Sequence, residues 1–275
     1  MQKTRVLYVT QEIAPFLPES EISSTVRALS QGVHEQDKEI RIFMPRFGVI
    51  NERRHQLHEV IRLSGMNLIV NDVDHPLIIK VASVPQARMQ VYFIDNEEFF
   101  KRKKTYTDDK GKYFDDNDER AMFFCRGVVE TVKKLGWTPD IVHCHGWMTA
   151  FMPLYLKKMY AEDPHFANSK VIYTPYEDEF DGSLDTKLTD KLNFDDIPNE
   201  DIEFLSSPEA INLNKTGAQW ADAVSFGSET INSELSSYIN STGKPVLEYQ
   251  EADTLVDMHQ EFYEKVLSEN GVLAD

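Results

Sequence analysis

The chain has 275 residues, of which 41% are hydrophobic and 27% are charged, and its formal net charge is −17. This composition is typical of a globular protein with a sizeable core, and the excess of acid predicts that it binds neither nucleic acid nor an anionic membrane. The sequence has no run near the roughly 18 apolar residues of a membrane span and no apolar signal core at its start, so we expect a cytoplasmic protein. Cys125 and Cys144 lie in apolar runs, which predicts free buried thiols.

The first 45 residues predict a βαβ unit. Residues 5–10 and residues 39–45 are short apolar runs with β-branched residues, typical of buried parallel strands. Between them, apolar side chains recur at the spacing of one helix face, at Ile22, Val26, Leu29 and Val33. Ser20 precedes this helix as its N-cap. A strand, a helix and a strand in this order begin a doubly wound sheet.

Residues 57–94 contain three strand-like runs without helical period, so we expect an antiparallel excursion or strands added at a sheet edge. The polar stretch that follows is expected to be an exposed loop. It includes four consecutive basic residues, 101–104, which predict a solvated surface rather than a phosphate site.

The middle of the chain repeats the pattern of helix and strand. A helix is predicted over residues 119–135 and ends at Gly136, and a strand follows at residues 140–144. The next helix contains Pro153, which we expect to kink it, and the strand 170–174 comes after it.

The C-terminal part opens with an acidic segment. Residues 177–203 hold eleven acidic and two basic side chains, which predicts a mobile surface insertion. A helix leading into a short strand and a further short helix follow. In the tail, one apolar helix face is formed by Leu255, Met258, Phe262 and Val266. We therefore expect a Rossmann-like domain over 1–250 and an amphipathic helix within 251–275 that packs on it.

These elements predict an α/β fold, a Rossmann-like doubly wound and mostly parallel sheet with an antiparallel excursion. In such sheets ligands bind at the carboxyl ends of the strands. Here those ends follow Thr10, Pro45, Cys144 and Thr174.

Seven stretches, in order along the chain, resemble the N-terminal domain of bacterial glycogen synthase and plant starch synthase. They are EIAPF, RALSQGV, MPRFG, VYFIDNEEFF, FDDNDERAMFF, WTPDIVHCHGWMTAFMP and GAQWADAVSFGSETINSEL. The resemblance implies one half of a two-domain GT-B glycosyltransferase, whose members retain configuration while moving glucose from ADP-glucose to α-1,4-glucan. It implies no cofactor and no metal, because protein cations and backbone N–H groups stabilise the diphosphate. The chain ends where the family's second domain would begin.

The turn after the first strand departs from the family. Where the family carries Lys-Thr-Gly-Gly-Leu beside the donor phosphate, this chain has Pro18, Glu19, Ser20 and Glu21 in place of the first four residues. A cation is lost and two anions are gained, and like unit charges about 4 Å apart repel by about 1–4 kcal/mol. Side chains also prevent the close backbone approach that glycine permits.

The sequence at the strand ends also differs from the family pattern. The family reads His-Asp-Trp-His-Thr where this chain has HGWMT, so His145 and Trp147 remain while Gly146 replaces the acid and Met148 the second histidine. Pro175 stands where the family has a histidine that faces the sugar. With Glu12, Pro18, Glu19, Ser20 and His143, these residues are the candidates for a remnant cleft.

His143 and His145 lie two residues apart and share a strand face, so both could reach one metal ion. Zinc needs three or four protein ligands, and Cys144 points to the opposite face. We favour the interpretation that these histidines hydrogen-bond to backbone and line the remnant cleft.

The resemblance predicts a glycogen or starch synthase-like protein that lacks full catalytic competence alone, a pseudoenzyme, whose ligands are ADP-glucose or α-glucan. The alternative is a non-catalytic module that binds glucan, a nucleotide, another protein or a second copy of itself. A third hypothesis is a different enzyme on this scaffold, with an acid–base cluster of Glu12, Glu19, Glu21, His143, His145 and Glu177.

Overall fold

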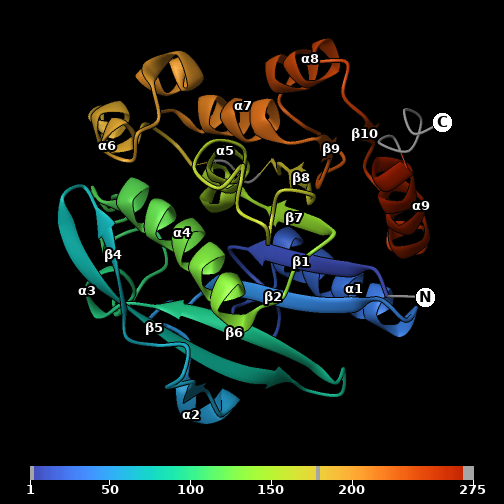
Figure 1. The fold of residues 1–275 in the computed structure, drawn as a ribbon, viewed down its shortest axis with the longest axis horizontal. Helices are drawn as coiled ribbons and strands as arrows, with labels where there is room; N and C mark the ends of the chain where they lie inside the picture. Colours follow the sequence, from blue (N-terminus) through green and yellow to red (C-terminus); the bar gives the residue numbers. More distant parts are fainter. Residues whose placement is uncertain (1–2, 178–179, 269–275) are drawn as a thin grey trace.

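The computed structural model describes residues 3–177 and 180–268, and within them a ten-stranded sheet forms the centre of the molecule (Figure 1). The strand order is β10-β9-β8-β7-β1-β2-β6-β5-β3, and β4 pairs with β5 alone. The parallel strands are β1 (Arg5–Thr10), β2 (Glu39–Pro45), β6 (Met89–Asp95), β7 (Ile141–His145), β8 (Lys170–Thr174), β9 (Ala223–Ser225) and β10 (Val246–Leu247). The antiparallel strands are β3 (His58–Glu59), β4 (Met66–Val70) and β5 (Val73–Val84).

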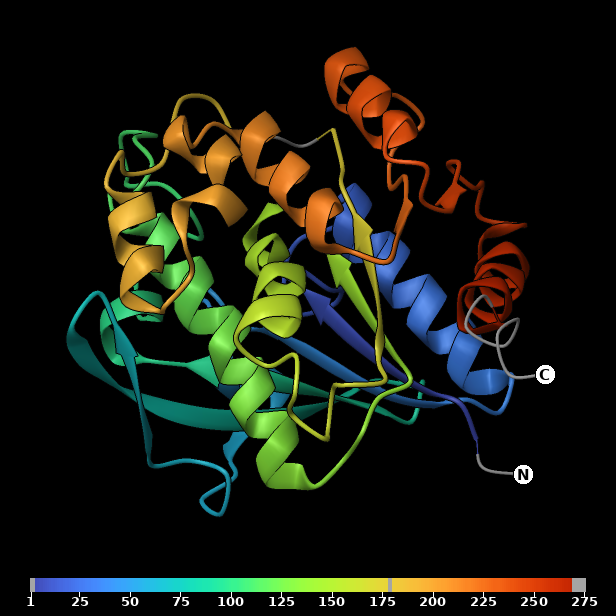
Figure 2. The same cartoon turned by 45° about the horizontal axis from the view of Figure 1, so that its top comes forward.

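Helices cover both faces of the parallel part, which explains why most residues of its strands are buried. One face carries α1 (Glu21–Glu35) and α9 (Leu255–Ser268), and the other carries α4 (Asn117–Leu135), α5 (Phe151–Lys158) and α7 (Ala210–Trp220) (Figure 2). The shorter helices are α2 (Glu52–His55), α3 (Glu97–Phe100), α6 (Leu188–Phe194) and α8 (Ser233–Ser241), with 3₁₀ turns η1 (Trp147–Thr149), η2 (Asn199–Asp201) and η3 (Glu203–Ser206).

The predicted Rossmann-like class is confirmed, and so are the boundaries of its first unit. Strand β2 has the predicted ends, and Ser20 caps α1 through a reciprocal pair of bonds with Ser23. The antiparallel excursion exists as β3, β4 and β5. Only two residues of the first of the three strand-like runs, residues 57–63, form a strand, and the strand 66–70 was not predicted.

The expected kink at Pro153 is wrong. Trp147–Thr149 form a separate 3₁₀ turn, so α5 starts at Phe151 and Pro153 falls in its first turn. An N–H in the first turn has no acceptor within the helix, and a proline there removes no hydrogen bond.

The acidic segment is not the surface insertion that its composition predicts. Six of its apolar residues are buried in the core, namely Phe180, Leu184, Leu188, Leu192, Ile197 and Ile202, while Phe194 is exposed. Lys191 is 5% exposed and forms ion pairs with Asp118, Glu119 and Asp185. Two acids of the segment are buried as well, Asp195 paired with Arg126 and Asp201 paired with Lys158. Buried apolar side chains and these ion pairs fix the segment to the body of the protein.

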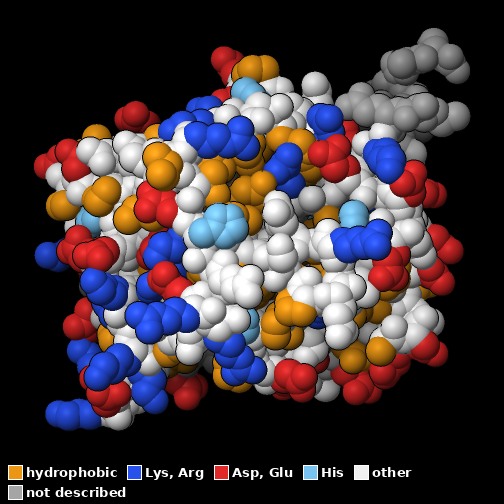
Figure 3. Space-filling view, turned by 90° about the horizontal axis from the view of Figure 1, so that it is seen from below, with side chains coloured by type: hydrophobic (Ala, Val, Ile, Leu, Met, Phe, Trp, Pro, Cys, Tyr) orange, Lys and Arg blue, Asp and Glu red, His pale blue; other side chains and the backbone are white. Residues whose placement is uncertain are grey.

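The basic run at 101–104 lies in a loop, as predicted. Lys101 pairs with Glu97, and Arg102 pairs with Asp116 while lying over the ring of Phe114. Acidic and basic side chains are interspersed over the face that carries α2 and β5 (Figure 3).

The tail helix docks beside α1, as its apolar face predicts. Leu255, Phe262 and Val266 are buried, whereas Met258 is only partly covered. Gly32 on α1 allows this approach, since a Cβ there would lie 2.4 Å from a methyl group of Val256. None of the helices in the described ranges has the length and apolar character needed to span a membrane.

Candidate functional site

His143 and His145 end strand β7 beside β1, and both are fully buried. Their ring centroids are 4.0 Å apart. His143 is hydrogen-bonded through Nδ1 to the hydroxyl of Tyr263 on α9 (2.8 Å) and through Nε2 to Thr174 (2.7 Å) and Ser225 (3.3 Å). The described hydrogen bonds of these two side chains go to hydroxyl groups and not to the predicted backbone partners, and α9 supplies one of those hydroxyls.

The second histidine has one satisfied nitrogen. Nδ1 of His145 is bonded to the hydroxyl of Tyr176 (3.0 Å), and Nε2 is buried without a hydrogen-bond partner in the described part of the chain. His145 borders a small cavity of about 10 Å³ together with Thr174 and His259. This volume is about the minimum for one water molecule, which would satisfy Nε2. Sequence reasoning missed Tyr176, although its place two residues after Thr174 continues the alternation of the strand.

Three neutral imidazoles share this space. Burial lowers the pKa of His143 and of His145 well below its usual range, and the neighbouring imidazoles lower it further. Burial also lowers the pKa of His259 on α9 to about 4, against a weaker opposite effect of its bond to the carbonyl of Leu255. Among the described residues no group of three or more His, Cys, Asp or Glu side chains is placed to hold a metal ion.

The geometry at Gly146 requires glycine. Its backbone has φ 84° and ψ 165°, a region that is essentially restricted to glycine. A Cβ there would lie 2.4 Å from Oε1 of Gln11, the oxygen that accepts a hydrogen bond from the N–H of Met148 (3.1 Å). Gln11 therefore occupies the space into which a side chain at position 146 would project.

Four predicted site residues meet at a single depression, which we call the carboxyl-end cavity. It has about 400 Å³ and is lined by Glu12, Phe16, Leu17, Pro18, Glu19, Ser20, Val49, Lys104 and Thr105. Glu12 accepts hydrogen bonds from the hydroxyls of Ser20 (2.6 Å) and Tyr106 (3.1 Å). Tyr106 is a contact that the sequence did not single out.

The N-terminus of α1, beside this cavity, is capped and surrounded by side chains of the protein itself. The Ser20 hydroxyl oxygen accepts a bond from the N–H of Ser23 (3.1 Å), and Glu19 and Glu21 are exposed around it. Carboxylates stabilise a helix N-terminus, and for the same reason they compete with an anionic ligand there. Lys104 is the cation among the residues lining the cavity, against Glu12 and Glu19.

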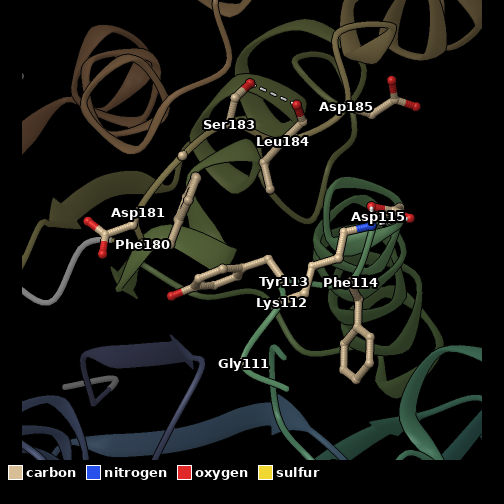
Figure 4. A pocket seen from close by; sticks show the side chains of 11 residues that line it. Gly111, Lys112, Tyr113, Phe114, Asp115, Phe180, Asp181, Ser183, Leu184 and Asp185 are labelled. Carbon is tan, nitrogen blue, oxygen red and sulfur yellow. Dashed lines mark hydrogen bonds and ion pairs between the residues drawn. The ribbon is translucent and has the colours of Figure 1, made fainter. Parts of the chain in front are cut away.

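An aromatic row leads from this cavity to a larger one. Trp147 is 4% exposed and its ring lies 5.5 Å from that of Tyr106 and 5.0 Å from that of Phe180, which in turn lies 5.7 Å from Tyr113. The larger depression, the aromatic cavity, has about 640 Å³ and lies between residues 111–115 and 180–185 (Figure 4). Asp115, Asp181 and Asp185 are at its rim.

The remaining candidates do not reach either cavity. Met148 and Pro175 are buried, and the Pro175 carbonyl accepts a bond from the N–H of Gly227 (3.0 Å). Four members of the hypothetical acid–base cluster are bonded to hydroxyl groups: His143 and His145 to Tyr263 and Tyr176, Glu21 to Ser228 and Glu177 to Thr230.

Comparison with known proteins agrees with this architecture. The family model of the starch synthase catalytic domain matches residues 5–246. Glycogen synthase from Chlorobium limicola is 36% identical over 84% of this chain and 47% of its own length, and that from Pelodictyon phaeoclathratiforme is 35% identical with the same coverage.

A solved structure shares the fold. The catalytic domain of starch synthase IV from Arabidopsis thaliana, bound to ADP and acarbose, superposes with a TM-score of 0.73 at 19% identity over 92% of this chain and 53% of that one. The chain thus spans about half the length of the curated relatives it matches. It belongs to the starch synthase catalytic domain family and has the fold of one half of a GT-B glycosyltransferase.

Proposed function

We propose that this chain is a glycogen and starch synthase-like protein that binds α-glucan and does not, by itself, transfer glucose from ADP-glucose. The carboxyl-end cavity carries this proposal. Glu12 and Glu19 line it, with Glu21 exposed nearby, at the helix N-terminus where the family resemblance places the donor diphosphate.

Glucosyl transfer from a nucleotide sugar develops negative charge on the departing diphosphate. In an active site, preorganised cations and N–H donors provide most of the stabilisation of that transition state. Here the Ser20 hydroxyl caps α1, and two carboxylates face one lysine around the cavity. Losing even one donor of this kind costs about 10²–10³ in rate, so little turnover is expected.

The glucan half of the proposal rests on the aromatic cavity. Sugar sites combine an apolar ring face with a few hydrogen-bonding groups, as ligand pockets in general do. Tyr113 and Phe180 supply rings, and Asp181 and Asp185 supply acceptors for hydroxyl groups, with the Trp147–Tyr106 pair continuing toward Glu12. The cavity's volume of about 640 Å³ is within the range of small-molecule sites. Acarbose, one of the two ligands named for the starch synthase IV structure, is a saccharide and agrees with this class.

Separate experiments test the two parts of the proposal, the binding of α-glucan and the absence of glucosyl transfer from ADP-glucose. We expect saturable calorimetric binding of maltoheptaose, no measurable binding of ADP-glucose, and no transfer of labelled glucose to maltoheptaose. Phe180→Ala should weaken maltoheptaose binding at least tenfold, with Phe194→Ala, an exposed aromatic truncation elsewhere in the segment, as the control. Circular dichroism checks that both variants are folded.

The possible results separate the hypotheses. Robust transfer by the isolated chain would refute the catalytic half, and tight binding of ADP-glucose without glucan would favour a nucleotide-binding module. Equal loss in the Phe180 and Phe194 variants would remove the aromatic cavity from the proposal.

A further inference from the structure

A further cavity lies at the amino end of the parallel strands. It is formed where α1 ends, where β2 and β6 begin, and where β5 ends at the tip of its hairpin with β6, and we call it the amino-end cavity. It has about 310 Å³ and is lined by His34, Ile40, Arg41, Ser83, Arg88, Met89, Gln90 and Tyr92. None of these lining residues is acidic, although the whole chain carries a net charge of −17.

Both arginines of this cavity lack an ion-pair partner within the described ranges. The nearest acid along β2 is Glu39, which already accepts hydrogen bonds from the indole N–H of Trp137 (2.6 Å) and from Nε of Arg5 (3.1 Å). The cavity therefore presents uncompensated positive charge in an acidic protein.

Two buried nitrogens at the cavity are also unsatisfied. Nε of Arg41 and Nδ1 of His34 are buried and have no hydrogen-bond partner in the part of the chain that the structure describes. A buried polar atom left without a hydrogen-bond partner costs about 1–3 kcal/mol, so such groups require an explanation. A ligand bound in the cavity would supply an acceptor for Nε of Arg41 and a partner for Nδ1 of His34, which donates or accepts according to its tautomer.

Arg41 is held in place before any ligand arrives. Its guanidinium lies over the rings of Trp137 (5.0 Å) and Tyr92 (5.8 Å) and donates to the Tyr92 hydroxyl (2.9 Å). A planar guanidinium fixed by stacking loses little entropy when it binds, and its fork of N–H donors matches phosphate oxygens. Arg88 is exposed on the hairpin turn and contributes the second charge.

We propose that the amino-end cavity binds a small phosphorylated sugar, with Arg41, Arg88 and His34 holding the phosphate and with Ser83 and Gln90, paired across β5 and β6, holding the sugar hydroxyls. The volume admits one phosphorylated hexose and little more. The site lies away from both cavities on which the proposed function rests, so it is tested independently of glucan binding.

The experiment is calorimetric titration of the full chain with inorganic phosphate, glucose 1-phosphate and glucose, at constant low ionic strength and pH 8. We expect saturable one-to-one binding of both phosphates, tighter for glucose 1-phosphate, and none for glucose. Arg88→Gln should weaken glucose 1-phosphate binding about tenfold, the loss expected for one charge-assisted hydrogen bond. Arg62→Gln, an exposed arginine with the same change of charge, should leave it unaltered.

A conservative variant separates the effect of the planar guanidinium donors from the effect of the positive charge. Arg41→Lys keeps the positive charge and removes the planar donors, and it should weaken phosphate binding at least fivefold while the unfolding midpoint stays close to that of wild type. Absence of saturable phosphate binding, or equal affinities of the Arg88 and Arg62 variants, would overturn the proposal. Glucose 1-phosphate binding no tighter than inorganic phosphate would overturn the assignment of a sugar.

Discussion

The two ends of the parallel strands carry cavities of similar size and opposite charge. The carboxyl-end cavity has Glu12 and Glu19 against Lys104, whereas the amino-end cavity has Arg41, Arg88 and His34 without an acid in its lining. Doubly wound folds place their ligands at the carboxyl end because strand ends and helix N-termini meet there. In this chain the backbone is retained at that end, but its side chains repel an anion. The comparison teaches that the fold offers a location and that local charge decides which ligand the location accepts.

The largest expected effect comes from removing the helix that seals the histidine end of the sheet. Deleting residues 252–275 removes Leu255, Phe262, Tyr263 and Val266, each buried, and leaves Tyr8 and His143 exposed. At about 1.5–3 kcal/mol for each buried side chain, we expect loss of most of the free energy of unfolding, measured by urea denaturation.

This deletion also tests the predicted division of the chain at residue 250. A truncated chain as stable as the full one would show that 251–275 is dispensable. Tyr263→Phe is the mild counterpart, which removes one hydroxyl from His143 and should cost about 1–3 kcal/mol. Tyr238→Phe, at a partly buried tyrosine, serves as its control.

The next largest effect is expected at Gly146, in the turn that follows β7. Gly146→Ala combines a left-handed backbone with a Cβ at 2.4 Å from Gln11, and we expect a loss of about 3 kcal/mol or more in unfolding free energy. Gly65→Ala has nearly the same φ (85°) with no described atom within 4 Å of the added Cβ, so it should cost only about 1–2 kcal/mol. Equal costs for the two variants would contradict the role of Gln11.

Acidification should loosen the histidine end. The folded pKa of His259 is about 4 and lies below that of an unfolded histidine, about 6.5. As pH falls below about 6.5, the unfolded chain binds a proton that the folded chain excludes, so stability drops by up to about 1.4 kcal/mol per pH unit until about pH 4. The pKa values of His143 and His145 are also lowered by burial, so both residues add to the loss of stability as pH falls.

A buried acid acts in the opposite direction. Burial raises the pKa of Asp118 to about 6, so the stability associated with its protonated form is regained as pH falls through that value. The measurement is therefore the difference in pH slope between wild type and His259→Gln, with exposed His58→Gln as control. Parallel slopes for wild type and the His259 variant would rule out the predicted effect.

The smallest effect is at the carboxyl-end cavity itself. Glu19→Lys should raise the affinity for ADP by about fivefold at low salt, because a surface charge contact is worth about 1 kcal/mol. Glu162→Lys makes the same change of charge at an exposed position elsewhere and should have no effect. A similar gain in both variants would mean that net charge, rather than the cavity, limits ADP binding.

Local sequence patterns were sufficient for most of the fold. The period of α1, the cap at Ser20 and the apolar strands are short-range signals that burial on both faces reinforces, and the structure agrees with them. The acidic segment was misjudged because its mean composition hides six apolar residues that are buried in the folded chain. A count of charges is a poor guide to such a segment, since Asp195 and Asp201 are themselves buried and paired with cations.

The sequence predicted only part of the candidate site. Motif order placed Glu12, Pro18, Glu19 and Ser20 together, as they are around one cavity, but their function stays a prediction. The burial of His143 could not be foreseen, since it depends on Tyr263, 120 positions further along the chain. The amino-end cavity joins α1, β2 and a hairpin tip, and no local motif marks such an assembly.

The hydroxyls and imidazole around His143 have a consequence for where protons reside. If His143 carries its proton on Nε2, that nitrogen donates to Thr174, and Tyr263 must donate to Nδ1 and accept from Tyr8. If the proton is on Nδ1, Tyr263 accepts it and donates to Tyr8, and a hydroxyl of Thr174 or Ser225 turns toward Nε2. One choice of tautomer on β7 thus sets the direction of the hydrogen bonds from His143 through Tyr263 to Tyr8 on β1, and the core of this protein has two mutually exclusive proton arrangements on that side of the imidazole.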